Sequence, residues 1–182
     1  IFYTLRWSPY EKKFFFDREG ALAALERFEA DGRPARIIGF PAFALDLCAD
    51  FRLKHRRAAR LNAASWVITG GGWKDKQDKA LDKALMREKL AAGLGLKTER
   101  VRDLFGMVEH GVPYVDCPHG NFHIPVYSRV FAKDPASLET LPYGKPGLLH
   151  FVTPYLTSYP SISFLSSDFG YVKKNCSCGL KG

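Results

Sequence analysis

The sequence contains few cysteines, few methionines and no long apolar run. No stretch of its 182 residues approaches the roughly 18 consecutive apolar residues that a membrane-spanning helix needs. Residues 1–10 also lack the basic start and the apolar core of a signal peptide. These absences predict a cytoplasmic protein without a membrane span.

Four cysteines, Cys48, Cys117, Cys176 and Cys178, are too few for the disulfide framework of a small secreted domain. A chain with 46% apolar residues can bury a core without such cross-links. We therefore expect reduced thiols or metal ligands at these positions.

The charge is not concentrated in one segment. Lysine and arginine number 27 against 19 aspartates and glutamates, but the basic residues are scattered along the chain. The net charge of the chain is +8, but a nucleoside triphosphate also needs a positive potential. We therefore expect no nucleic-acid partner.

Two periodicities alternate in the first half of the chain. Apolar residues recur at helical spacing in residues 20–30, 43–59 and 74–90. Strand-like runs at 35–40 and 65–69 separate these helices. The alternation predicts an α/β fold with a largely parallel sheet flanked by helices.

The pattern changes after the third helix, which we expect to stop at Gly93 and Gly95. Thr98 can begin a short helix, and glycine and proline then indicate a long loop as far as Asn121. Strands are predicted at 122–131, 148–153 and 161–165.

No internal repeat, low-complexity tract or linker divides the sequence. We therefore expect a single domain or fragment over residues 1–182. It would consist of an α/β parallel-sheet part at 1–115 and a β-rich part with a Cys/His cluster at 116–182.

Gly70, Gly71 and Gly72 directly follow a predicted strand. Because they lack side chains, a flat ring or a phosphate can approach their backbone N–H and C=O groups closely. A flexible strand-to-helix turn is the alternative interpretation.

Two carboxylates follow predicted strands farther along the chain. Phe105 and Gly106 precede Glu109, which could hold a magnesium ion against phosphates or could be a solvated loop acid. Asp168 could accept two hydrogen bonds from ribose hydroxyls or could belong to an ordinary turn.

The order of these motifs resembles the adenylate-forming superfamily, which makes an acyl-adenylate from a carboxylic acid and ATP. The run Gly-Gly-Gly-Trp-Lys at 70–74 resembles the acyl-protein synthetase (LuxE) branch in particular, with phenylacetate–CoA ligases as the alternative. The resemblance extends from about Arg33 to Gly182. It implies the carboxyl-terminal half of the large domain, with ATP and Mg²⁺ as cofactors.

The resemblance also implies roles for individual residues. The glycines at 70–72 would face the adenine and the acyl pocket, Phe105 with Gly106 would stack on the adenine, and Asp168 would hold the ribose. Glu109 would be the catalytic residue that binds magnesium or orders the triphosphate. Phe40, Phe43 and Trp66 could line the acyl pocket or be ordinary core residues.

The sequence departs from the family pattern in two ways. Val108 replaces the threonine whose hydroxyl touches the α-phosphate, and His110 is a candidate substitute. The phosphate loop and the mobile lid with its catalytic lysine have no counterpart in these residues. We therefore expect an incomplete enzyme that is inactive alone.

Cys117, His123, Cys176 and Cys178 form a second candidate site. Three thiolates and an imidazole make a closed tetrahedral zinc site when a fold brings two such pairs together. Some phenylacetate–CoA ligases carry similar pairs at similar places, and His119 is an alternative fourth ligand. The cysteines could instead be ordinary reduced thiols. The resemblance further implies an acyl-accepting cysteine, for which Cys176 and Cys178 are candidates.

The other candidates have simpler interpretations. Cys48 is expected in the core, His55 at a solvated helix end, His150 in a strand and His110 in an exposed loop.

The predicted function is ATP-dependent activation of a carboxylic acid, a fatty acid by resemblance, followed by transfer of the acyl group to a thiol. The acceptor would be a protein or coenzyme A. A CoA ligase of the phenylacetate type and a non-catalytic, zinc-stabilised binding module are the alternatives.

Overall fold

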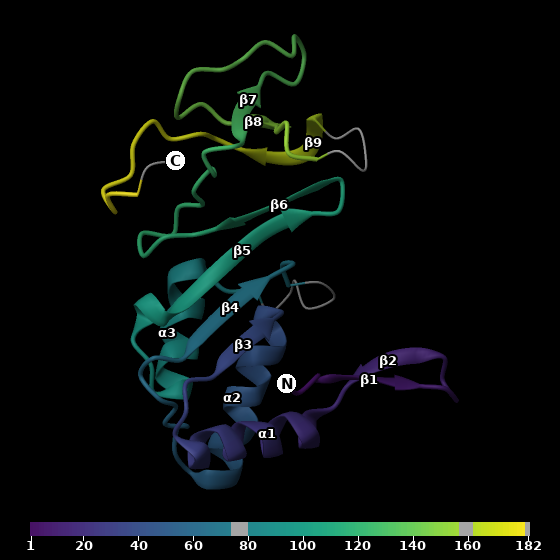
Figure 1. Ribbon diagram of the computed structural model, residues 1–182, viewed down its shortest axis with the longest axis vertical. Helices are drawn as coiled ribbons and strands as arrows, with labels where there is room; N and C mark the ends of the chain where they lie inside the picture. The colour runs from purple at the N-terminus through teal and green to yellow at the C-terminus, as the bar shows by residue number, and fades with distance from the viewer. Residues whose placement is uncertain (74–79, 157–161, 181–182) are drawn as a thin grey trace. The chain divides into compact units, whose positions relative to one another are not determined.

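A computed structural model describes residues 1–73, 80–156 and 162–180 (Figure 1). The chain divides into two compact units, Ile1–Asp103 and Leu104–Gly182. Each unit has a hydrophobic cluster of its own. No helix among the described residues is long and apolar enough to span a membrane.

Helix α1 (Arg18–Asp31) contributes to the core of the first unit. Asp17 caps the helix, because its Oδ1 accepts a hydrogen bond from the backbone N–H of Gly20 at 2.9 Å. The helix ends at Gly32, whose φ of +65° is a left-handed conformation that glycine adopts readily. The helix predicted at 20–30 is confirmed.

Strands β3 (Arg36–Gly39) and β4 (Trp66–Gly70) pair in parallel, with Ile37 opposite Val67. In the strand order, β4 lies between β3 and β5 (Val101–Met107). The hydroxyl of Thr69 donates to the carbonyl oxygen of Arg102 at 3.2 Å. The predicted α/β class and the parallel pairing of these two strands are therefore confirmed.

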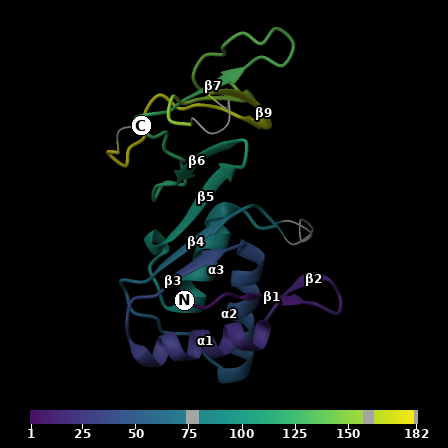
Figure 2. The ribbon, with the colours of Figure 1, turned by 45° about the vertical axis from the view of Figure 1, so that its right-hand side comes forward.

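Helices α2 (Pro41–His55) and α3 (Lys83–Leu94) complete the first core. One cluster joins Val67 of β4 to Leu25, Phe51 and Leu90, so α1, α2 and α3 cover the same face of the sheet (Figure 2). Ile38, which alternates to the other face, is 73% exposed. The sheet of this unit is thus covered by helices on the Val67 face.

The start of α3 differs from the prediction. Residues 74–79, which carry the first turns of the helix predicted at 74–90, lie outside the described residues. Residues 80–82 are not helical. The helix begins after Asp82, whose side chain caps it by accepting hydrogen bonds from the backbone N–H groups of Ala84 and Leu85. Gly93 lies inside α3, which stops at Leu94, so of the two predicted stops the one at Gly95, with a left-handed φ of +68°, is confirmed.

An antiparallel hairpin precedes α1. It consists of β1 (Leu5–Ser8) and β2 (Lys13–Phe16), and Figure 2 shows it extending away from the helices. Trp7 and Phe14 pack edge to face across the hairpin with ring centroids 5.1 Å apart. No element was predicted for these residues from the sequence.

The second unit contains a hairpin where a loop was predicted. After a short 3₁₀ turn, η2 (Thr98–Arg100), β5 pairs antiparallel with β6 (His110–Val115). Glycine and proline within 110–115 suggested a loop, but His110, Val112 and Tyr114 are buried at strand spacing. The burial of alternate side chains therefore outweighs the loop signal.

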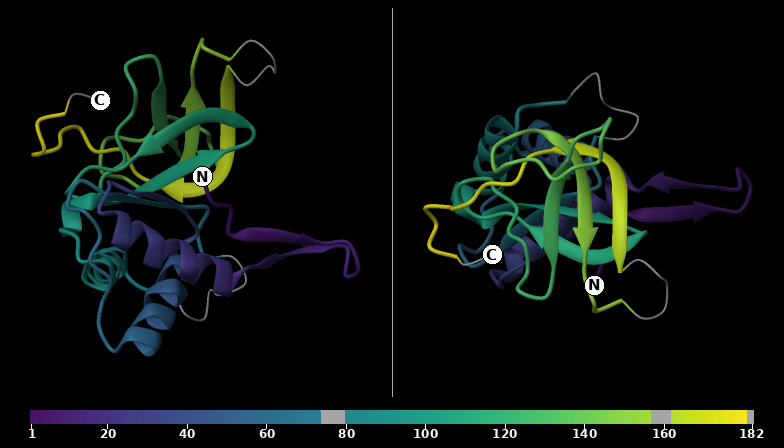
Figure 3. Two further views of the ribbon diagram at one scale, coloured as in Figure 1. Left: turned by 60° about the horizontal axis from the view of Figure 1, so that its bottom comes forward. Right: turned by 90° about the horizontal axis from the view of Figure 1, so that it is seen from above.

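A three-stranded antiparallel sheet completes this unit, with the order β7–β8–β9 (Figure 3). Its strands are β7 (Arg129–Lys133), β8 (Gly147–Val152) and β9 (Ser163–Gly170). The strand predicted at 148–153 is confirmed. The strand predicted at 122–131 begins only at Arg129, and the one predicted at 161–165 continues to Gly170.

Candidate functional site

A cavity of about 460 Å³ lies within the second unit. Its lining combines aromatic side chains with a few polar ones, and includes Phe105, Phe122, Phe151, Asp168, Lys173 and Cys176. A concave, mostly apolar site with a small number of polar groups is typical of a site for a small ligand. Two residues that the sequence analysis assigned to a nucleotide therefore line one cavity.

Phe105 enters this cavity from β5, within an aromatic group. Its ring lies 5.8 Å from that of Phe151 in a stacked arrangement and 6.0 Å from that of Phe122. These neighbours restrict the Phe105 ring, which is half-buried and lines the cavity. Gly106, the next residue of β5, is exposed, and a Cβ atom there would meet nothing within 4 Å.

Asp168 lies inside β9 rather than after it, which corrects the predicted position. Leu148 pairs with Phe169 while His150 pairs with Leu165, so three residues of β9 stand opposite one residue of β8. Such a bulge redirects side chains locally. The Asp168 N–H donates to the Ser166 hydroxyl at 3.1 Å, and the side chain is exposed at the cavity.

Glu109 lies in the two-residue turn between β5 and β6, since Met107 pairs with His110. It is exposed and is not among the residues that line the cavity. Val108 beside it is 99% exposed. The structure thus brings Phe105 and Asp168 together but leaves Glu109 at the end of a hairpin.

His110 is fully buried, so the prediction of an exposed loop histidine is wrong. Its Nε2 lies 2.8 Å from the hydroxyl of Tyr114, which lies 2.9 Å from the hydroxyl of Ser128. Ser128 donates in turn to the carbonyl oxygen of Val152. His110 is therefore part of a buried hydrogen-bonded chain and has a structural role. The role near a phosphate was suggested only by its position next to Glu109 in the sequence.

The glycine run belongs to the first unit. Gly70 ends β4, and Gly71 and Gly72 have φ angles of +74° and +69°. These angles favour glycine, and a Cβ atom at Gly72 would meet nothing within 4 Å. The run is therefore an open backbone segment at a strand end. Lys74 of the same motif lies outside the described residues.

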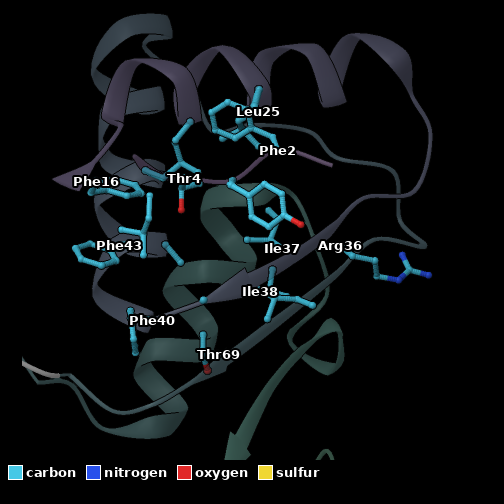
Figure 4. A pocket seen from close by; sticks show the side chains of 18 of the residues that line it. Phe2, Thr4, Phe16, Leu25, Arg36, Ile37, Ile38, Phe40, Phe43 and Thr69 are labelled. Atoms are coloured by element: carbon cyan, nitrogen blue, oxygen red, sulfur yellow. The ribbon is translucent and has the colours of Figure 1, made fainter. Parts of the chain in front are cut away.

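A second cavity, of about 660 Å³, lies within the first unit and is predominantly apolar (Figure 4). Phe40 and Phe43, two candidates for an acyl pocket, line it, whereas Trp66 does not. Phe43 stacks on Phe16 with ring centroids 4.7 Å apart. Thr69, the residue before Gly70, also lines the cavity. An apolar chain would find aliphatic and aromatic surroundings here.

The second unit also brings together Cys117, His123, Cys176 and Cys178. One ligand atom from each lies within 4.8 Å of the others. All four cysteines of the chain are described, and none forms a disulfide. The alternative fourth ligand, His119, is not part of this group.

The spacing of the four ligand atoms fits a tetrahedral zinc ion. Cys117 Sγ and Cys176 Sγ are 3.7 Å apart. Two thiolates at about 2.3 Å from one tetrahedral zinc would be about 3.8 Å apart. Cys178 Sγ lies 3.2 Å from His123 Nε2, somewhat closer than the roughly 3.6 Å of a thiolate and an imidazole around zinc.

Backbone and amide donors surround the sulfurs. Hydrogen bonds from the Cys178 backbone N–H and then from the Asn121 side chain lower the pKa of the Cys176 thiol to about 6. Burial raises the pKa of the Cys178 thiol, although the Leu180 N–H donates to its sulfur at 3.4 Å. A lowered thiol pKa favours the thiolate that a metal requires.

The remaining candidates have structural roles. Cys48 is 9% exposed in the first core, and burial raises its pKa to about 12, so the predicted core position is confirmed. His55 lies at the end of α2, with its Nε2 2.7 Å from a Glu26 carboxylate oxygen. His150 lies in β8, as expected, and contacts the hydroxyl of Ser163.

Comparison with solved structures supports the fold. The chain is similar to 2-hydroxyisobutyryl-CoA ligase in complex with 2-HIB-AMP and CoA, with a TM-score of 0.63 and 17% identity over 86% of this chain and 31% of that one. It is also similar to ATP-bound MatB from Rhodopseudomonas palustris, with a TM-score of 0.59 and 18% identity over 87% and 31% of the two chains.

Sequence comparison gives a more specific relationship. The long-chain-fatty-acid–luciferin-component ligase of Vibrio harveyi is 30% identical over 159 residues, which are 87% of this chain and 42% of that protein. The chain therefore spans less than half the length of this curated relative. The profile of the family described as acyl-protein synthetase, LuxE, matches residues 11–182. The chain thus belongs to the LuxE acyl-protein synthetase family, as its resemblance at residues 70–74 predicted.

Proposed function

We propose that the protein containing this chain activates a long-chain fatty acid with ATP and transfers the acyl group to a thiol. The observation that carries the proposal is the presence of Phe105 and Asp168 on one cavity of the second unit. Membership of the LuxE family and the name of the Vibrio harveyi ligase support the choice of a fatty acid. A cytoplasmic location is part of the same proposal.

In the proposed reaction, a carboxylate oxygen of the fatty acid attacks the α-phosphorus of ATP. The new oxygen–phosphorus bond gives the acyl-adenylate, and the bond from the α-phosphorus to the oxygen that bridges to the β-phosphate breaks to release pyrophosphate. The sulfur of the acceptor thiol, which loses its proton, would then attack the acyl carbonyl carbon, and the bond from that carbon to AMP would break to release AMP. Phe105 would stack on the adenine, with Gly106 beside it, and Asp168 would accept hydrogen bonds from the ribose hydroxyls. These contacts orient the nucleotide, and orientation supplies a large part of such catalysis.

Glu109 and the glycines would act on the phosphates and the acyl group. An exposed carboxylate such as Glu109 suits Mg²⁺, which usually binds one or two carboxylates together with substrate phosphates. A bound Mg²⁺ would neutralise phosphate charge. The open backbone at Gly70, Gly71 and Gly72 would offer N–H and C=O groups to the substrate, as the family resemblance implies. Within the same unit, the apolar cavity that contains Phe40 and Phe43 is the candidate site for the acyl chain.

We also propose that Cys117, His123, Cys176 and Cys178 hold a structural zinc ion. The match between their separations and tetrahedral geometry supports this assignment. Zinc would hold the two sulfurs near the carboxyl end as ligands, so Cys176 and Cys178 would not carry the acyl group. The acceptor would then be a thiol of another protein, of another part of this one, or of coenzyme A.

The nucleotide site is tested by measuring ATP binding to the zinc-loaded 182-residue chain by calorimetry. Asp168→Asn should weaken binding by about tenfold or more, because it removes a charged acceptor of two hydrogen bonds. Glu139→Gln changes an exposed carboxylate of the same unit that does not line the cavity. Equal affinities of the two variants would contradict the proposed site.

The reaction is tested on the protein to which these residues belong. Fatty-acid-dependent exchange of labelled pyrophosphate into ATP should occur, and it should fall sharply in Asp168→Asn and Glu109→Gln. Acyl transfer to coenzyme A, with none to a protein, would favour the CoA ligase alternative. If the protein retains zinc but shows no exchange of pyrophosphate into ATP, the result would favour the non-catalytic module.

A further inference from the structure

Asn121 connects the Cys/His cluster to the cavity of the second unit. Its side-chain Nδ2 donates to Cys176 Sγ at 3.3 Å, and its Oδ1 accepts from Lys173 Nζ at 2.7 Å. The amide therefore uses its donor on a sulfur and its acceptor on an ammonium group, which fixes its orientation. Asn121, Lys173 and Cys176 all line the cavity.

The backbone around Asn121 is held by the same cluster. The N–H of Cys117 donates to the carbonyl oxygen of Asn121 at 2.9 Å, and the N–H of Gly120 donates to that of Cys117 at 2.9 Å. Gly120 has a φ of +76°, which closes this tight loop. Asn121 is thus tied to one candidate zinc ligand through its backbone and to another through its side chain.

Lys173 is the one lysine or arginine among the described residues that line the cavity. Its Nζ also lies 5.8 Å from the centre of the Tyr171 ring. Val108 offers no hydroxyl to a phosphate, and His110 is buried against Tyr114. Among the described residues that line the cavity, Lys173 is therefore the candidate for a cationic contact with an anionic nucleotide.

We infer that Asn121 couples the metal site to the cavity by holding Lys173 toward the phosphate of a bound nucleotide. The inference rests on the proposed nucleotide site. Lys173 binds the phosphate, and Asn121 is a positioning residue. When the metal holds Cys176 in place, the amide of Asn121 keeps its orientation and Lys173 keeps its position. Hydrogen bonds to metal ligands commonly transmit such constraints.

The test compares AMP with adenosine, which lacks the phosphate, on the zinc-loaded chain in excess zinc. Lys173→Met should weaken AMP binding about tenfold and leave adenosine binding unchanged, as expected for loss of one charge-assisted contact. Lys174→Met is the matched control, because Lys174 is exposed and does not line the cavity. Equal AMP affinities for the two lysine variants would overturn the inference.

The coupling has its own readout. Asn121→Ala should weaken AMP binding as much as Lys173→Met while zinc stays bound, and the zinc-free wild type should bind AMP equally weakly. If Asn121→Ala binds AMP like the wild type, the coupling is wrong even when Lys173 matters. If the wild type binds neither adenosine nor AMP, the proposed nucleotide site fails as well.

A measurement without nucleotide keeps the structural part of the inference testable. In cadmium-substituted protein, the ¹¹³Cd resonance reports the environment of the thiolates. Asn121→Ala should shift this resonance because it removes the N–H donor to Cys176, whereas Lys174→Met should leave it in place. An unshifted resonance in Asn121→Ala would contradict the hydrogen bond between amide and thiolate.

Discussion

A Cβ atom at Gly95 would lie 2.8 Å from the carbonyl oxygen of Ala59, so the end of α3 lies directly against the backbone that follows α2. Two hydrogen bonds hold this contact: Ala59 N–H donates to Gly93, and Leu61 N–H donates to Leu94, each at 3.0 Å. Position 95 therefore requires glycine for two reasons, the positive φ angle and the lack of space for a Cβ atom.

Gly95→Ala should destabilise the first unit by about 2–3 kcal/mol, because the left-handed conformation costs about 1–2 kcal/mol and the clash adds to it. Gly32→Ala is the control, since Gly32 has a similar φ of +65° but nothing within 4 Å of its Cβ position. It should lose only the roughly 1–2 kcal/mol that the left-handed conformation costs. All three tryptophans lie in the first unit, so urea unfolding followed by tryptophan fluorescence measures the difference. Equal losses would show that the space around Gly95 is not limiting.

Tyr114→Phe should destabilise the second unit by about 1–3 kcal/mol, because it removes two hydrogen bonds from a buried polar network. The Tyr114 hydroxyl lies between His110 Nε2 and the Ser128 hydroxyl, and burial raises its pKa. Hydrogen exchange of the β6 amides would measure the loss. Tyr127→Phe, at a side chain that is 41% exposed, should change it little. A loss in Tyr127→Phe as large as that in Tyr114→Phe would count against a special role for the buried chain.

The same residues show why part of the fold was not predictable from the sequence. The regular helix and strand periods near the amino terminus predicted α1, β3 and β4 correctly. Residues 110–115 contain glycine and proline, which are common in loops, and only tertiary burial of alternate side chains makes them a strand. Asp168 was placed after its strand because a bulge in β9 cannot be seen in a single sequence.

The candidate site was also predictable from the sequence only in part. Residue types, together with the resemblance to phenylacetate–CoA ligases, grouped Cys117 and His123 with Cys176 and Cys178, because zinc uses few ligand types. The link from Asn121 to Lys173 was missed, since an asparagine and a lysine separated by 52 positions carry no local signal. Cysteine spacing can suggest a metal site, but the neighbours that orient its ligands come from the fold.

The Glu29 carboxylate should make the first unit sensitive to acid. It accepts two hydrogen bonds from Arg57, at 2.7 and 2.8 Å, and another from the Arg60 backbone N–H. The hydrogen bond from Arg57 is the main reason that the pKa of Glu29 is lowered. A carboxyl whose pKa is lower in the folded state stabilises above its unfolded pKa of about 4.3, and that stabilisation is lost as pH falls through the folded pKa.

Glu29→Gln should therefore cost about 1 kcal/mol at pH 7, and the difference from the wild type should shrink steadily below about pH 4. Urea unfolding at several pH values, followed by tryptophan fluorescence, measures this trend. Glu88→Gln, at an exposed position of α3, should show little effect at any pH. A Glu29→Gln deficit that persists unchanged at pH 3 would mean that Glu29 stabilises by packing rather than by charge.

Elemental analysis should find one zinc ion per chain, and the double variant Cys176→Ser and Cys178→Ser should lose it. Both sulfurs belong to the group of ligand atoms within 4.8 Å, and serine oxygen is a far weaker zinc ligand than thiolate. Cys48→Ala should retain the metal, because Cys48 lies in the core of the first unit. A chelator should lower the unfolding midpoint of the wild type and of Cys48→Ala, but not that of the double variant, since binding energy stabilises only a chain that can bind. Zinc that remains in the double variant would remove these sulfurs from the metal site and restore them as candidates for acyl transfer.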